Sequence, residues 1–321
     1  MSELIHVPVM PVQVIELLAP PGPGLVIDAT VGEGGHSALF LEHSPHLQLV
    51  GLDADAVMLE RAAMRLAPFS GRFSLRHVWF DRYFSAYPET ERPRVVLFDL
   101  GISMFHYQQA GRGFSFREQE QLDMRLDPES GRSAADIVNQ YGERELADLL
   151  FQLGEERYSR RIAAAIVRRR REAPIASAHD LAEVVFTSVP VAYRHGRIHP
   201  ATRTFQALRI EVNGELQRLR RALEAALDVL DVGGRLGVIS FHSLEDRIVK
   251  QLFRERKNRS IDAGHAPMNS SEMHWSERKG NGEQFSLVTR RPLVADDEEC
   301  RRNPAARSAK FRVIEKVREV S

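Results

Sequence analysis

The chain of 321 residues is long enough for one large domain or for two domains of ordinary size. Its 44 Lys and Arg residues balance its 44 Asp and Glu residues. This neutral composition excludes a protein that coats nucleic acid through a basic tail, but it leaves a local basic surface open. A single cysteine, Cys300, excludes an internal disulfide, a cysteine zinc cluster and a redox pair.

The sequence carries no signal for a membrane or for export. No apolar run approaches the ~18–20 residues that span a bilayer. The first residues lack a basic region, and Pro8 and Pro11 interrupt the apolar stretch that a signal peptide would need. We therefore expect a cytoplasmic protein without a membrane partner.

Short apolar strands alternate with helical patterns through the first hundred residues. We predict strands at residues 25–30, 47–53, 73–78 and 95–99, and helices at 37–41 and 56–66. Strands that alternate with helices in this way are typical of a parallel sheet with helices on both faces.

The pattern then changes. Residues 105–204 contain no strong strand and predict helices, of which 144–153 and 156–171 are the best candidates. Leu and Val residues at spacings of three and four predict one long helix at 204–230. Further strands are predicted at residues 236–241, 285–289 and 310–317. A helix is predicted after the first of these strands, because Leu244, Ile248, Val249, Leu252 and Phe253 fall on one face.

The economical interpretation is an α/β protein with one sheet domain interrupted by a helical domain. The sheet domain takes residues 1–104 and 205–321, and the inserted domain takes residues 105–204. The insertion would then follow the fourth strand at the carboxyl edge of the sheet, where ligands bind in such folds.

A glycine-rich loop follows the first predicted strand. Gly32, Gly34 and Gly35 let the backbone approach a ligand, and the helix that follows offers unpaired N–H groups. Ser37 breaks the G-x-G-x-x-G pattern, and no P-loop motif is present. Asp53 ends the next strand, where an acid commonly accepts hydrogen bonds from ribose. The pattern fits S-adenosylmethionine (SAM) or a nicotinamide dinucleotide, and the plainer alternative is a tight turn beside solvated acids.

A second acid favours SAM. Asp99 ends the fourth strand, which is where the methyl acceptor binds in Rossmann-like methyltransferases. The two late strands also suit the antiparallel edge of a methyltransferase sheet better than a dehydrogenase sheet. This argument for SAM rests only on an analogy between folds.

Ordered sequence blocks along almost the whole chain match one known family. The matching blocks are residues 6–9, 28–37, 51–55, 99–103, 112–116, 122–125, 199–210, 239–247 and 307–312. On these blocks the chain resembles the bacterial MraW family of ribosomal RNA cytosine-N4 methyltransferases. The resemblance implies a Rossmann-like, class I SAM-dependent methyltransferase fold whose inserted helical domain recognises substrate. It also implies methylation of the N4 amino group of a cytidine in the decoding region of 16S rRNA, with the small ribosomal subunit as partner.

The resemblance also assigns the cofactor contacts. The implied SAM-binding residues are Gly34, Gly35, His36, Asp53, Phe80, Asp99 and His106. His106 departs from the family pattern, which has a glutamine at this position after two serines and a proline. We expect His106 to replace one hydrogen bond of that glutamine.

Methyl transfer to N4 needs an acceptor for the amino protons, because the cytosine N4 lone pair is delocalised into the ring. We expect Asp99 and Ser103 to be the catalytic residues, with the carbonyl of Leu100 as an alternative acceptor. The competing interpretation is that Asp99 only binds SAM.

The target base must leave its stack, which favours an aromatic pocket. Phe105, Tyr107, Phe114 and Phe116 are candidates, although such residues are more often core. Expected RNA contacts are Arg160, Arg161, Arg168, Arg203 and Arg247. The alternative is that these arginines form a solvated face.

No metal site is expected, since His36, His199 and His242 lack the spacing of metal ligands. Three other functions remain open. They are a nicotinamide-dependent oxidoreductase, an RNA-binding assembly factor with a vestigial SAM pocket, and a methyltransferase that acts on DNA or protein.

Overall fold

The computed structural model describes residues 7–108, 111–116, 119–129, 131–196, 198–258 and 284–319. His6, in the first matching block, lies outside them. The chain divides into two compact units. Unit 1 comprises Met1–Gly101 and Arg218–Ser321, and unit 2 comprises Ile102–Gln217. Unit 2 extends beyond both ends of the insertion predicted at 105–204. No helix among the described residues is long and apolar enough to cross a membrane.

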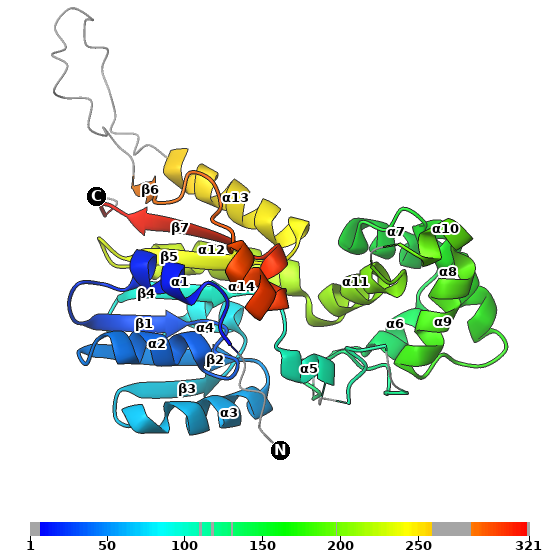
Figure 1. The fold of residues 1–321 in the computed structure, drawn as a ribbon, viewed down its shortest axis with the longest axis horizontal. Coiled ribbons are helices and arrows are strands. Elements are labelled where there is room, and N and C mark those ends of the chain that lie inside the picture. Colours follow the sequence, from blue (N-terminus) through cyan, green and yellow to red (C-terminus); the bar gives the residue numbers. More distant parts are fainter. Residues whose placement is uncertain are drawn as a thin grey trace, which may run out of the picture. The chain divides into compact units, whose positions relative to one another are not determined.

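Unit 1 is built on a seven-stranded sheet (Figure 1). The strands are β1 (Gly24–Asp28), β2 (Leu47–Asp53), β3 (Phe73–His77), β4 (Pro93–Asp99), β5 (Arg235–Ser240), β6 (Phe285–Leu287) and β7 (Lys310–Lys316). Their order is β3-β2-β1-β4-β5-β7-β6, and only β7 runs antiparallel to its two neighbours, β5 and β6. This sheet confirms the predicted fold class.

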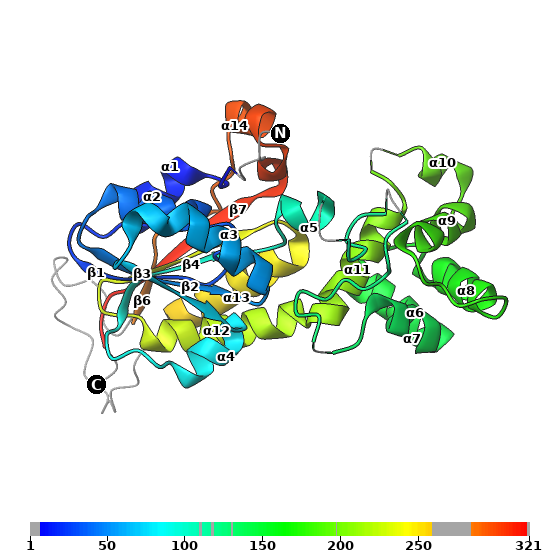
Figure 2. The same ribbon diagram turned by 90° about the horizontal axis from the view of Figure 1, so that it is seen from below.

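Helices cover both faces of the sheet (Figure 2). One face packs against α1 (Pro11–Leu18), α2 (Gly35–His43) and α3 (Ala56–Leu66), and the other packs against α4 (Phe80–Ala86), α12 (Glu215–Val229) and α13 (Ser243–Asn258). The central strand β4 shows why helices pack on both faces of the sheet, since it has apolar side chains on each face. Val95 and Leu97 enter one core, while Val96 and Phe98 enter the other, because successive side chains of a strand point to opposite faces.

Unit 2 is helical. Its helices are α5 (Met104–Gln108), α6 (Ala134–Gln140), α7 (Glu143–Gly154), α8 (Ser159–Arg170), α9 (Ala178–Ser188), α10 (Val191–Arg194) and α11 (Ala201–Asn213). Ser133 and Asp136 form a capping box at the start of α6, and Ser177 caps α9. The helices enclose a core of their own, to which α8 contributes Ile162 and Ile166.

The prediction of one helix over 204–230 was wrong. The segment forms two helices, α11 and α12, separated by Gly214 in the left-handed conformation at φ 60°. Glycine adopts this conformation without a Cβ clash and commonly ends a helix, so the leucine spacing continues through a break in the backbone. Three helices of unit 1 were not predicted: α1, α4 and α14 (Asp297–Arg302).

Candidate active site

The loop after β1 brings backbone N–H groups to the carboxyl edge of the sheet. Gly32 and Gly34 have positive φ angles of 50° and 78°. Gly34 precedes the first turn of α2, and a Cβ placed there would lie 3.4 Å from the Ala62 Cα. The positive backbone angle therefore favours glycine here, while a Cβ would make an ordinary contact with α3.

Asp53 fixes this loop from the end of β2. The Gly32 N–H donates to Asp53 Oδ2 at 3.0 Å, and the Asp55 N–H donates to Asp53 Oδ1 at 2.9 Å. Asp53 thus orders the loop, and the ribose contact that the sequence predicts for it stays a prediction.

A second network joins the ends of β1 and β4. Ser37 Oγ donates to Asp28 Oδ2 at 2.7 Å, and the Asp99 N–H donates to Thr30 Oγ1 at 2.7 Å. Burial raises the pKa of the Asp28 carboxyl, against the lowering effects of the Ser37 hydrogen bond and the His36 charge. Sequence reasoning did not assign site roles to Asp28, Thr30 and Ser37. The available signal was their place around the glycine loop in the block 28–37.

His36 and Asp99 face each other at this edge. His36 Nε2 lies 3.3 Å from Asp99 Oδ2, a contact distance for an ion pair but without hydrogen-bond geometry. Both ring nitrogens of His36 and the Asp99 Oδ1 are buried, and none of the three hydrogen bonds to another described residue. Buried polar atoms are normally paired. These open positions therefore mark a place for a polar ligand.

Phe80 lies on the face of the sheet covered by α4. Its half-buried ring makes an edge contact with Phe98 at 5.6 Å between centroids. The next residue, Asp81, is buried and accepts hydrogen bonds from Arg218 and Arg221 at 2.9 and 2.7 Å. These two ion pairs join α4 to α12 in unit 1 and hold the segment that carries Phe80.

Ser103 and His106 belong to unit 2. Ser103 Oγ lies 3.2 Å from His106 Nδ1 and accepts the Phe105 N–H at 3.2 Å. His106 is buried and contacts the edge of Phe114, with 5.4 Å between ring centroids. Of the other aromatic candidates, Phe114 is buried in the core of unit 2, Phe116 is half-buried and Tyr107 is exposed.

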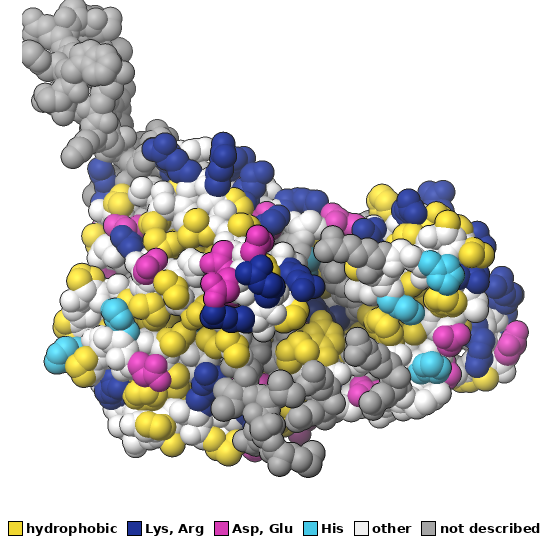
Figure 3. All heavy atoms as spheres, viewed as in Figure 1, with side chains coloured by type: hydrophobic (Ala, Val, Ile, Leu, Met, Phe, Trp, Pro, Cys, Tyr) yellow, Lys and Arg dark blue, Asp and Glu magenta, His cyan; other side chains and the backbone are white. Residues whose placement is uncertain are grey.

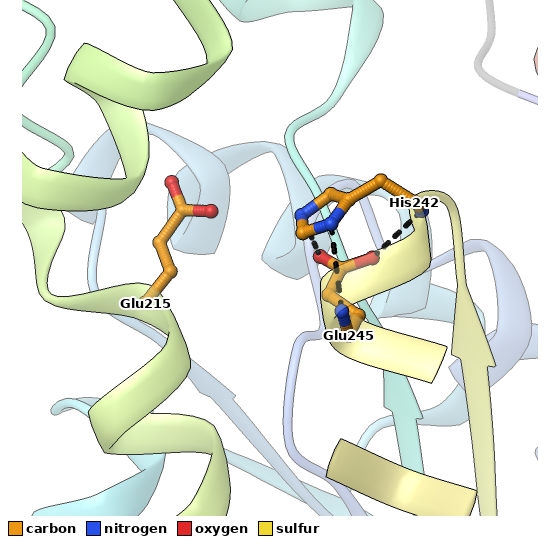
Figure 4. A group of neighbouring side chains, drawn as sticks. All are labelled: Glu215, His242 and Glu245. Carbon is orange, nitrogen blue, oxygen red and sulfur yellow. Dashed lines mark hydrogen bonds and ion pairs between the residues drawn. The ribbon is translucent and has the colours of Figure 1, made fainter. Parts of the chain in front are cut away.

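His242 and Glu245 lie just beyond the carboxyl end of β5 (Figure 4). Glu245 Oε2 accepts the Phe241 and His242 N–H groups at 2.8 and 3.2 Å, and its Oε1 lies 3.2 Å from His242 Nε2. Glu245 therefore supports the first turn of α13. Glu215, also drawn in the figure, belongs to unit 2, where it pairs with Arg209 at 2.8 Å.

The predicted RNA-binding arginines lie in both units and differ in their surroundings. Arg160, Arg161 and Arg168 are exposed on α8, and none of them forms an ion pair with another described residue. Figure 3 shows Lys and Arg side chains along the rim of unit 2 that carries α8. The Arg203 guanidinium already makes one hydrogen bond within unit 2, because it donates to the Glu155 carbonyl at 2.8 Å. Arg247 is exposed on α13 of unit 1.

Comparison with known proteins identifies the family of this chain. The sequence model of the MraW methylase family matches residues 3–317. Three similar relatives are each named ribosomal RNA small subunit methyltransferase H. The protein of Treponema denticola is 49% identical over 98% of both chains. The protein of Saccharopolyspora erythraea is 46% identical over 98% of this chain and 94% of its own, and that of Synechococcus elongatus is 42% identical over 98% and 96%. The chain belongs to the MraW methylase family.

Proposed function

We propose that this protein transfers a methyl group from SAM to the N4 amino group of a cytidine in the 16S rRNA of the small ribosomal subunit. The family and the names of the relatives support an RNA methylase of the small subunit. The observation that carries the proposal is the pair of buried His36 and partly buried Asp99, whose buried polar atoms without a hydrogen bond from a described residue lie at the carboxyl edge of the sheet. A ribosomal substrate implies that the protein works in the cytoplasm.

The residues at the sheet edge fit SAM. The Gly32–Gly35 turn gives close backbone approach, Asp53 offers acceptors for ribose, and His36 offers a donor for the carboxylate of SAM. Phe80 supplies an apolar surface for the adenine ring. When bound, SAM supplies an electrophilic methyl group on its sulfonium.

Asp99 is the proposed acceptor for the N4 protons. Its Oδ1 is buried without a hydrogen bond from any described residue, and its N–H is fixed by Thr30. A hydrogen bond from N4 to this oxygen would orient the amino group and localise its lone pair, and the carboxylate would take the proton that N4 loses. Ser103 is a second proposed contact, although its Oγ already accepts the Phe105 N–H. His106 remains a proposed cofactor contact.

Unit 2 is the proposed RNA-recognition part of the enzyme. Arg160, Arg161 and Arg168 present exposed guanidinium groups on one helix, and guanidinium groups bind phosphates of RNA. Arg203 and Arg247 are proposed as further contacts.

Labelled SAM and small subunits from a strain that lacks this gene provide the test. The wild-type protein should label the 16S rRNA, and mass analysis of the nucleosides should identify N4-methylcytidine. Label on another atom or on a protein would contradict the proposal. SAM binding without any transfer would favour the assembly factor, and the absence of SAM binding would exclude a SAM methylase.

A further inference from the structure

Unit 2 contains an open pocket of about 620 Å³ whose lining comes entirely from that unit. Its lining includes Phe116, His179, Glu183, His199 and Thr202. Ligand pockets for small organic groups commonly have volumes of about 300–1,000 Å³. The pocket is therefore large enough for one heterocyclic base.

Aromatic rings form one wall. The rings of Phe116 and His199 stack with 4.6 Å between centroids and 25° between planes, and His199 and Phe186 are parallel within 15° at 5.8 Å. Phe205 contacts the Phe116 ring edge-on at 5.1 Å and fixes its position. His199 thus lies between the rings of Phe116 and Phe186, and half-buried Phe116 at the end of this stack lines a pocket that is open to solvent.

Polar groups accompany this aromatic wall. The Ala201 N–H donates to His199 Nδ1 at 3.2 Å, so the proton of the neutral ring sits on Nε2. Burial lowers the pKa of His199, although the nearby Glu183 charge acts in the opposite direction. The lowered pKa favours the neutral ring near pH 7. The pocket therefore combines a ring N–H donor with the exposed carboxylate acceptor of Glu183.

We propose that this pocket binds an unstacked nucleobase of the RNA substrate, an inference that rests on the proposed function. Flat aromatic side chains stack on bases, typically for about 1–3 kcal/mol per base. The edge of a base carries adjacent donors and acceptors, which complement Glu183 and His199. Exposed arginines on α8 of the same unit would attract the RNA backbone.

The test uses the full-length protein and a short single-stranded RNA that carries one 2-aminopurine, whose fluorescence is quenched by stacking. The wild type should quench it. Phe116→Leu should weaken binding about tenfold because the stacking surface is lost, and Glu183→Gln should weaken it about threefold because a charged acceptor becomes neutral. The matched controls are Phe151→Leu on α7 and Glu172→Gln, both exposed and outside the pocket, and these should bind as the wild type does.

Three outcomes would overturn the inference. These are no quenching by the wild type, equal losses in the pocket variants and their controls, and a loss in Phe116→Leu that appears with whole subunits but not with naked RNA. The last result would indicate a protein ligand. Glu183 lies on the exposed surface, so its variant remains informative if Phe116→Leu does not fold. Quenching that depends on Phe116, in a protein that methylates no subunit, would support the pocket and refute the proposed methylation.

Discussion

The two units use charged side chains in opposite ways. In unit 1, Asp28, Asp53 and Asp99 lie at the ends of strands. Asp28 and Asp53 accept hydrogen bonds from Ser37 and from the glycine loop, and the Asp99 N–H donates to Thr30 Oγ1. In unit 2, Arg160, Arg161 and Arg168 of α8 are exposed to solvent and have no ion-pair partner among the described residues. A rigid, buried arrangement selects a ligand by geometry, whereas exposed cations attract a polyanion from a distance and depend on salt. The contrast supports the proposal that unit 1 binds the cofactor and that unit 2 attracts the RNA.

The largest effect is expected at Asp99. Asp99→Asn keeps the size of the side chain but removes its charge and its ability to take a proton. Methyl transfer should fall by about 10²–10³-fold, while the dissociation constant for SAM should rise less than about tenfold. Single-turnover transfer and calorimetric SAM titration measure the two quantities. Equal losses in both would show that Asp99 only binds the cofactor.

The next effect concerns the buried charge of Asp81. Asp81→Asn should lower the free energy of unfolding by about 2 kcal/mol, because two arginines lose their partner. Glu224→Gln is a control on the same helix, α12, where the exposed pair with Arg220 is worth less than about 1 kcal/mol. Urea unfolding measures both variants. If Glu224→Gln lowered the free energy of unfolding as much as Asp81→Asn does, buried and exposed ion pairs of unit 1 would contribute equally to stability.

Asp81 also predicts a dependence on pH. Burial tends to raise its pKa, but the hydrogen bonds and charges of Arg221 and Arg218 outweigh burial and hold the pKa below the ordinary value of 3.8. The stabilisation is therefore present above pH 3.8 and is lost as the pH falls through the lower folded-state pKa. The stability difference between wild type and Asp81→Asn should narrow in this acidic range and stay constant near neutrality.

A smaller effect is expected at Gly34. Gly34→Ala places a Cβ at a positive φ and 3.4 Å from the Ala62 Cα, which should cost about 1–2 kcal/mol of stability and weaken SAM binding. Gly22→Ala is the matched control, since its Cβ would meet no described atom within 4 Å. Thermal unfolding and SAM titration should separate the two variants, and identical behaviour would argue against a rigid loop.

The smallest effect per residue is expected on α8. Replacement of Arg160, Arg161 and Arg168 by Gln should leave SAM binding unchanged and reduce the slope of log K for RNA against log salt by about two units. Arg82→Gln, an exposed arginine of unit 1, is the control and should change the slope by less than about 0.5 unit. An unchanged slope in the triple variant would remove α8 from the proposed RNA surface.

The sequence predicted the sheet well because its strands are short apolar runs bounded by acids or glycines. Their patterns persist whatever packs around them. Helix limits were harder to predict, as the segment 204–230 shows. Its leucine spacing continues from α11 into α12, and only the left-handed backbone of Gly214 reveals the break. The short helix α4 has seven residues, too few to show a period.

The motifs also predicted Gly34, His36, Asp53 and Asp99 as site residues, since glycine turns and acids at strand ends have recurrent chemical roles. The motifs could not show that Asp53 holds the Gly32 N–H, or that His36 and Asp99 approach within 3.3 Å. Those contacts join residues that are far apart in the chain and depend on the register of three strands.

The amino-acid sequence by itself determined the class of fold and the family, and it predicted the loop that meets the cofactor. It also showed that neutral overall charge conceals a concentration of arginines in one segment. Tertiary structure alone decided which charges are buried and which remain in solvent, and it brought together the rings of Phe116 and His199 from two separate loops. The physical reason is that periodicity records local preference, whereas burial and stacking depend on segments that meet only in the folded chain.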